Sequence, residues 1–200
     1  MAGQAAKQAL IEVCKVNPPD DFGAAIRVLV VNESGFIREG LCQVIDRFEG
    51  VNVVGCTHYT PDLEEVAQRL RVNVALIDSQ HFHHVGFHAA RQLFENRDET
   101  RVVFLSVNPR LTDVKGAMQS GASGFLLREA GVRDLQAALH AAAQGEVFLC
   151  PTLLKRLSKE QGSENTLEGI NVGTSYHQNR YSIDEMLLQA QHLGILQQDE

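Results

Sequence analysis

The stretch IRVLVV, residues 26–31, decides the fold class of this chain. It is a nearly continuous run of β-branched and other apolar residues, which is typical of a strand buried on both faces of a parallel sheet. Asn32 and Glu33 follow directly, and apolar residues then recur at helical spacing from 35 to 47. A buried strand that leads into an amphipathic helix is the repeating unit of an α/β domain.

The same unit recurs along the chain. Short apolar runs predict four further strands, at 51–56, 72–78, 101–106 and 124–127. Helical spacing of apolar residues predicts helices at 61–70, 86–96, 111–120 and 132–143. The result is a doubly wound parallel sheet of five strands, in which function is expected where the strands end at their carboxyl edge.

The length of 200 residues and the composition set limits on the protein class. The chain has room for one ordinary domain at 26–150, an extension at 1–25 and a tail at 151–200, which excludes a long multidomain enzyme. A hydrophobic share of 44% supports a packed core, and a net charge of −7 disfavours a chain-wide basic surface for nucleic acid.

Targeting signals and cysteine usage indicate the compartment. The N-terminal apolar stretch is too brief for a secretory signal, and no run approaches the roughly 18 apolar residues of a membrane helix. The four cysteines, Cys14, Cys42, Cys56 and Cys150, are widely spaced and predict neither a zinc knuckle nor a small disulfide framework. We expect a soluble, cytoplasmic protein without a membrane segment.

Polar residues follow the predicted strands in a chemically coherent set: Asn32, Glu33, Asp78, Ser106 and Arg128. A carboxylate beside a second acidic or amide group can hold one hard divalent cation through oxygen ligands, as Mg²⁺ requires. A hydroxyl and a cation opposite would bind a phosphoryl group on Asp78.

From residue 26 to about residue 157, the chain resembles the receiver domain of response regulators of the NarL/LuxR type. The resemblance rests on VVNESGFIREGL (30–41), VALID (74–78) with Gly86 beyond it, RVVFLS (101–106) and GAMQSGASGFLLREA (116–130). It implies the flavodoxin-like receiver fold, followed by a short, mainly helical C-terminal appendage.

The resemblance also implies roles for individual residues. Asp78 matches the phospho-accepting aspartate, Ser106 the hydroxyl that follows the phosphoryl group, and Phe125 the aromatic residue that moves with it. Asn32 and Glu33, together with Asp78, match the residues that hold Mg²⁺.

Three positions depart from the pattern of the family. The acidic pair, usually two aspartates or a Glu-Asp pair, is Asn32-Glu33, and an Asn supplies only a neutral oxygen, so Mg²⁺ should bind weakly. Arg128 replaces the usual lysine, which is not a conservative exchange at a phosphoryl site. His81-Phe82 replaces the usual Met-Pro after the aspartate's strand.

These departures favour an atypical response regulator in two-component-type signalling, a non-enzyme that acts by protein-protein contact or as a homodimer, with weak or absent phosphorylation of Asp78. Its expected partner is a sensor histidine kinase or another signalling protein. An ordinary phosphorylatable receiver remains the alternative. An enzyme on the same fold would need a cofactor signature such as GxGxxG, which the sequence lacks.

A histidine cluster and two cysteines lie outside the set of residues at the strand ends. The cluster HFHHVGFH (81–88) is read as solvated loop histidines, with a metal-binding or pH-sensing role as the alternative. Cys42 and Cys56 are expected to act as small buried hydrophobic residues.

The tail carries a degenerate remnant of a helix-turn-helix. LSKEQ (157–161) and GINVGTSYHQNR (169–180) resemble its start and its recognition helix, but the scaffold helices between them are missing. Residues 182–196 form a well-capped amphipathic pattern. The alternative function is a phosphorylation-controlled transcription regulator that binds DNA through 157–196, with His177, Gln178 and Arg180 as contacts.

Overall fold

The computed structural model describes residues 25–78, 83–95 and 100–160. Most of the extension at 1–25, His81-Phe82 of the histidine cluster, and the tail beyond residue 160 lie outside the described residues. The predictions for the helix-turn-helix remnant from 161 onwards and for the helix at 182–196 therefore remain predictions.

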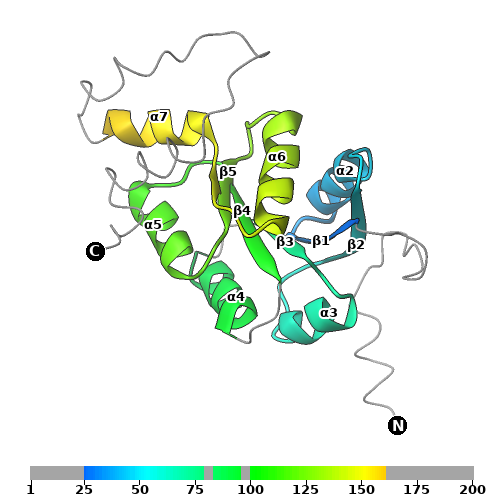
Figure 1. Cartoon of the computed structure of the whole chain (residues 1–200). Helices are drawn as coiled ribbons and strands as arrows, with labels where there is room; N and C mark the ends of the chain where they lie inside the picture. The colour runs from blue at the N-terminus through cyan, green and yellow to red at the C-terminus, as the bar shows by residue number, and fades with distance from the viewer. Residues whose placement is uncertain (1–24, 79–82, 96–99, 161–200) are drawn as a thin grey trace.

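Six parallel strands form one sheet in the order β2-β1-β3-β4-β5-β6 (Figure 1). The strands are β1 (Ile26–Val31), β2 (Val51–Thr57), β3 (Val74–Asp78), β4 (Arg101–Ser106), β5 (Gly124–Leu127) and β6 (Phe148–Leu149). The helices are α2 (Gly35–Ile45), α3 (Leu63–Arg69), α4 (His83–Glu95), α5 (Leu111–Gln119), α6 (Val132–Ala143) and α7 (Pro151–Glu160). The predicted alternation of strands and helices is confirmed.

The prediction of five strands is wrong by one. β6 extends the sheet beyond β5, with Phe125 paired to Leu149. A strand of two residues is too short to show any period in the sequence, so only its pairing with β5 reveals it.

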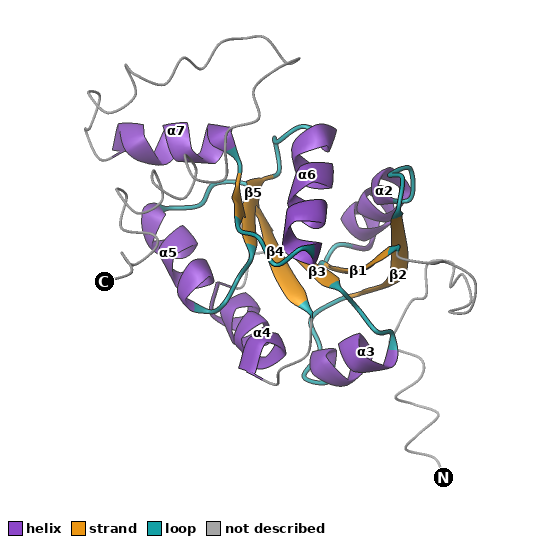
Figure 2. Ribbon diagram, in the orientation of Figure 1, coloured by secondary structure: helices purple, strands orange, loops and turns teal. Residues whose placement is uncertain are grey.

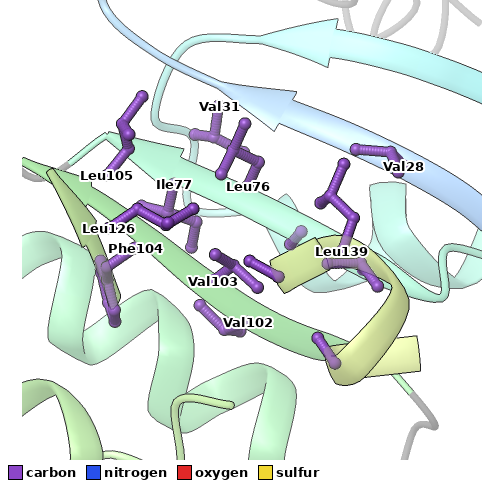
Figure 3. Close-up of a cluster of buried hydrophobic side chains, with 14 of the residues drawn as sticks. Val28, Val31, Leu76, Ile77, Val102, Val103, Phe104, Leu105, Leu126 and Leu139 are labelled. Carbon is purple, nitrogen blue, oxygen red and sulfur yellow. The ribbon is translucent and has the colours of Figure 1, made fainter. Parts of the chain in front are cut away.

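The helices cover both faces of the sheet. Figure 2 shows α2 and α6 on one side and α3, α4 and α5 on the other. The strands between these layers are buried throughout their central residues, as the continuous apolar runs predict. In the close-up of Figure 3, Leu139 of α6 lies against the strands that carry Val28 and Val103.

The packed core continues past residue 150 into the predicted tail. Leu153, Leu154 and Leu157 of α7 are buried, and the helix packs at the β5 side of the sheet. Pro151 stands at the start of α7, a position that a helix tolerates because the first N–H groups have no partner within it. None of the helices in the described part of the chain is long and apolar enough to cross a membrane.

Candidate functional site

The predicted site residues meet at the carboxyl edge of the sheet. Asn32 follows β1, Asp78 ends β3, Ser106 ends β4 and Arg128 follows β5. These four strands are neighbours in the sheet, so side chains separated by up to about a hundred positions in sequence emerge side by side. The doubly wound order of the strands therefore assembles the site.

Asp78 stands at the centre and is buried, with 6% of its surface exposed. The side-chain amide of Asn32 donates a hydrogen bond to Asp78 Oδ2, and the Arg128 guanidinium forms an ion pair with the same oxygen through Nη2. A buried carboxylate is costly unless it is paired and hydrogen-bonded. In this site, one cation and one neutral amide supply that compensation.

Asn32 is held in this orientation by its own turn. Its Oδ1 accepts a hydrogen bond of 2.7 Å from the backbone N–H of Ser34, which leaves the NH₂ group facing Asp78. Its backbone N–H donates to the carbonyl of Thr57 at the end of β2, at 3.0 Å. The neutral oxygen expected to face a cation is thus engaged in an Asx-type turn at the start of α2.

Glu33 has a different set of contacts. Its side chain is exposed, and Oε1 accepts a hydrogen bond of 2.9 Å from the backbone N–H of Tyr59. The structure thus brings Asn32 into direct contact with Asp78 and holds Glu33 against the segment that follows β2.

Ser106 and Phe125 are both buried beneath this edge. The Ser106 carbonyl accepts a hydrogen bond of 2.8 Å from the backbone N–H of Arg128, which ties the end of β4 to the residue that pairs with Asp78. The Phe125 ring is fully buried, with its centroid 6.0 Å from that of Phe104. Phe104 in turn meets Phe87 of α4 edge-on, at 5.6 Å.

Tyr59 is a site residue that sequence reasoning missed. Its hydroxyl donates to the backbone carbonyl of Asp78 at 3.0 Å, while its backbone N–H holds Glu33. Burial raises the pKa of the Tyr59 hydroxyl, and the nearby Asp78 and Glu33 raise it further, so the group stays protonated and remains a donor. A lone tyrosine after a strand carries no signal by which the sequence would reveal this contact.

Arg38 is a second residue that was missed. It is buried in the first turns of α2, and Nη1 donates to the carbonyls of Asn32 at 2.7 Å and of Glu33 at 3.2 Å. The guanidinium thus fixes the backbone that carries both side chains. An arginine among the apolar positions of FIREGL was the signal available in the sequence.

Comparisons with known proteins agree with this architecture. The family model described as the response regulator receiver domain matches residues 28–140. This chain belongs to the response regulator receiver family.

Individual relatives are similar over the same part of the chain. The response regulator GacA of Pseudomonas aeruginosa is 27% identical over 133 residues, covering 66% of this chain and 62% of the relative. The nitrate/nitrite response regulator protein NarL of Escherichia coli K12 is 31% identical over 126 residues, covering 63% of this chain and 58% of the relative. The match therefore spans less than two thirds of the length of these curated relatives.

Solved structures show the same fold. The signal receiver domain of the putative response regulator NarL from Mycobacterium tuberculosis has a TM-score of 0.54 and 26% identity, over 62% of this chain and all of that one. A two-component response regulator of the LuxR family from Aurantimonas sp. SI85-9A1 has a TM-score of 0.63 and 19% identity, over 69% of this chain and 99% of that one. The resemblance to NarL/LuxR-type receivers is confirmed.

Receiver domains typically bind Mg²⁺ in an acidic pocket, and the residues of this receiver fit that ion poorly. Asn32 directs its NH₂ group, not its oxygen, at Asp78, and Arg128 places a positive charge on the same carboxylate. Within the described ranges, no three His, Cys, Asp or Glu side chains are grouped so that they could hold a metal ion. Asp78 is paired with Arg128 and Glu33 is bonded to the backbone of Tyr59, so both carboxylates are engaged by other groups of the protein.

The structure describes one histidine side chain of the 81–88 cluster and three of the four cysteines. In the cluster at 81–88, His88 is exposed on α4, and the side chains of the other three histidines lie outside the described residues. Cys42 and Cys150 are buried free thiols. Cys56 is also buried, as expected.

Proposed function

We propose that this chain is an atypical response regulator whose receiver domain signals by protein-protein contact or dimerisation, with weak or absent phosphorylation of Asp78. The observation that supports this function is the double engagement of Asp78 Oδ2 by Asn32 and Arg128. A carboxylate that accepts a hydrogen bond from an amide and pairs with a guanidinium has its negative charge stabilised, so it is a weaker nucleophile toward phosphorus.

The pocket also lacks the charge that would attract the cation needed for phosphoryl transfer. An amide replaces one carboxylate, and Glu33, the remaining acidic neighbour, is exposed and bonded to Tyr59. Arg128 differs from lysine in reach and shape, because its guanidinium is a planar fork and the lysine ammonium is a compact point charge, so the exchange is not conservative at a phosphoryl site. Mg²⁺ is therefore expected to bind weakly through Asn32, Glu33 and Asp78.

In this function, Asp78 is the residual phosphoacceptor, and Ser106, Arg128 and Phe125 form the phosphate and switch site. The partner is a sensor histidine kinase or another signalling protein in the cytoplasm, and the active unit is a homodimer. No catalytic turnover is expected of the chain. This expectation agrees with the family, whose members are signalling and transcription regulators.

The test is the intact mass of the full chain after phosphoramidate treatment with and without Mg²⁺. A matched pair of variants provides the comparison: Asn32→Asp with Arg128→Lys restores the usual residues, and Asp78→Ala removes the acceptor. We expect little or no phosphoryl gain in the natural chain and a Mg²⁺-dependent gain in the double variant. A stoichiometric Mg²⁺-dependent gain in the natural chain, lost in Asp78→Ala, would overturn the proposal.

The second candidate is a phosphorylation-controlled, DNA-binding transcription regulator acting through residues 157–196. It is favoured by the similarity to the transcriptional regulatory protein YdfI of Bacillus subtilis, which is 27% identical over 135 residues. Fluorescence anisotropy of a labelled duplex, titrated with the full chain at rising salt, distinguishes the two candidates. Binding that weakens steeply with ionic strength supports the DNA-binding regulator, because phosphate contacts release counterions.

A further inference from the structure

The helix α7 is attached to two of the elements that carry the candidate site. Through β6, the chain just before α7 pairs with β5, and the backbone N–H of Cys150 donates to the carbonyl of Phe125 at 3.3 Å. Leu153 and Leu157 then anchor the helix in the core. Figure 1 shows α7 near β5, towards the edge of the sheet that lies away from α2 and α3.

A side chain of α7 also reaches the segment between β4 and α5. The Arg156 guanidinium donates a hydrogen bond through Nη2 to the side-chain oxygen of Asn108. Asn108 lies two residues beyond Ser106, whose carbonyl accepts from the backbone of Arg128. Arg128 in turn forms the ion pair with Asp78.

We propose that the Arg156–Asn108 contact is a latch that couples the Asp78 pocket to α7, and through α7 to the chain beyond residue 160. The proposal rests on the proposed function only in taking the Asp78 pocket as the site that senses the signal. It requires no phosphorylation, because any event that changes the Arg128–Asp78 ion pair acts on the same path.

The proposed coupling runs from Asp78 through Arg128 to the segment that follows β4. Loss of the charge on Asp78 releases the Arg128 side chain, and the backbone of Arg128 is bonded to the end of β4. The segment from Val107 to Arg110 follows immediately, and because Val107 and Asn108 are exposed they can shift while Pro109 stays buried. Asn108 moves with that segment, and the hydrogen bond to Arg156 is then made or broken.

Amide hydrogen exchange of the full chain, followed by mass spectrometry, tests the latch. Asp78→Asn removes the charge in the pocket with little change of shape, and exchange in α7 is measured relative to exchange in α6. We expect Asp78→Asn to speed relative exchange in α7 by about threefold, the effect of losing one weak exposed hydrogen bond. In an Arg156→Ala background, exchange in α7 is already faster, and Asp78→Asn adds nothing further.

A matched control separates the latch from a general effect of charge or stability. Lys155→Ala removes a neighbouring positive charge of α7 and should leave the response to Asp78→Asn intact. An equal response in the natural and Arg156→Ala backgrounds, or no response in either, would overturn the latch. The proposed function fails by a different result, the phosphoryl gain of the natural chain, so the two failures are distinguishable.

Discussion

Asp78 shows how a single buried charge shapes its surroundings. A carboxylate at this depth needs compensating partners, and Arg128 and the side-chain amide of Asn32 both bond to it. Asn32 and Arg128, two of the positions that depart from the family pattern, therefore both bond to Asp78. Arginine and the usual lysine carry the same charge, so only Asn32 changes the charge of the pocket, and Arg128 balances the charge of Asp78.

Replacement of Arg128 by Ala should destabilise the protein by about 3 kcal/mol, because it leaves the Asp78 carboxylate buried without a cation. We expect the low end of the usual range, since the Arg128 side chain keeps 22% exposure. Urea unfolding at neutral pH measures the loss. Adding Asp78→Asn to Arg128→Ala should recover part of the stability, and a double variant no more stable than Arg128→Ala would contradict this balance of charge.

The ionisation of Tyr59 should make the stability of the fold depend on pH in the alkaline range. The pKa of its hydroxyl is raised in the folded state, whereas in the unfolded chain it ionises near its ordinary value of 10.0. The contribution of Tyr59 to the free energy of unfolding is therefore fully present below pH 10. It is lost as the pH rises above 10, by up to about 1.4 kcal/mol per pH unit.

The variant Tyr59→Phe isolates this contribution. It should cost about 1 kcal/mol at pH 8, because the hydrogen bond to the Asp78 carbonyl is lost. Its stability should also fall less steeply between pH 10 and 11 than that of the natural chain, as measured by urea midpoints. Identical alkaline slopes in the two proteins would show that Tyr59 does not titrate in this way.

At the scale of elements, α4 packs closely over the site. A Cβ atom at Gly86 would lie 3.0 Å from Tyr59 Oη and 3.3 Å from Phe104 Cε1. Gly86 therefore permits the approach of α4 to the end of β3 and to the residue that follows β2. The first turns of α4 depend on this close contact.

Gly86→Ala should destabilise the protein by about 1–3 kcal/mol through overpacking. The matched control is Gly40→Ala in α2, where nothing lies within 4 Å and the gain in helix propensity is about 0.5–1 kcal/mol. Thermal unfolding compares the two variants. If they changed stability in the same direction, the close contact at Gly86 would have no energetic weight.

The helix α7 behaves as part of the receiver core. Leu157 is fully buried, so Leu157→Ala should cost about 2–5 kcal/mol, the usual effect of a cavity in a packed interior. Lys159→Ala, on the exposed side of α7, should change stability by no more than about 0.5 kcal/mol. Chemical denaturation that finds Leu157→Ala as mild as Lys159→Ala would mean that α7 is dispensable for the fold.

For the whole molecule, the balance of charge in the pocket predicts a weak linkage between Mg²⁺ and folding. A ligand that binds only the folded state stabilises it by an amount that grows with the logarithm of the ligand concentration relative to Kd, so at a fixed concentration a weak site gives little gain. We expect millimolar Mg²⁺ to raise the unfolding temperature by less than about 1 °C in the natural chain. The variant with Asn32→Asp and Arg128→Lys should gain about 2 °C or more, and equal shifts measured by calorimetry would contradict a weakened site.

The fold class and most of the element boundaries follow from local patterns in the amino-acid sequence. The strands at 101–106 and 124–127 and the helix at 132–143 are confirmed at the predicted bounds. The reason is that buried parallel strands and amphipathic helices each impose a local period on the chain. The sequence also indicated that polar residues would gather at the carboxyl edge, because that edge follows from the alternation of strands and helices.

The tertiary structure alone decided how those polar residues are paired. The meeting of Asn32 and Arg128 on one oxygen of Asp78, and the contact of Tyr59 with the Asp78 carbonyl, join segments separated by 19 to 50 positions. β6 likewise exists only through its pairing with β5, and the inward face of α7 is defined only by the core that it covers. Contacts of this kind depend on three-dimensional proximity, for which a local pattern of residues carries no signal.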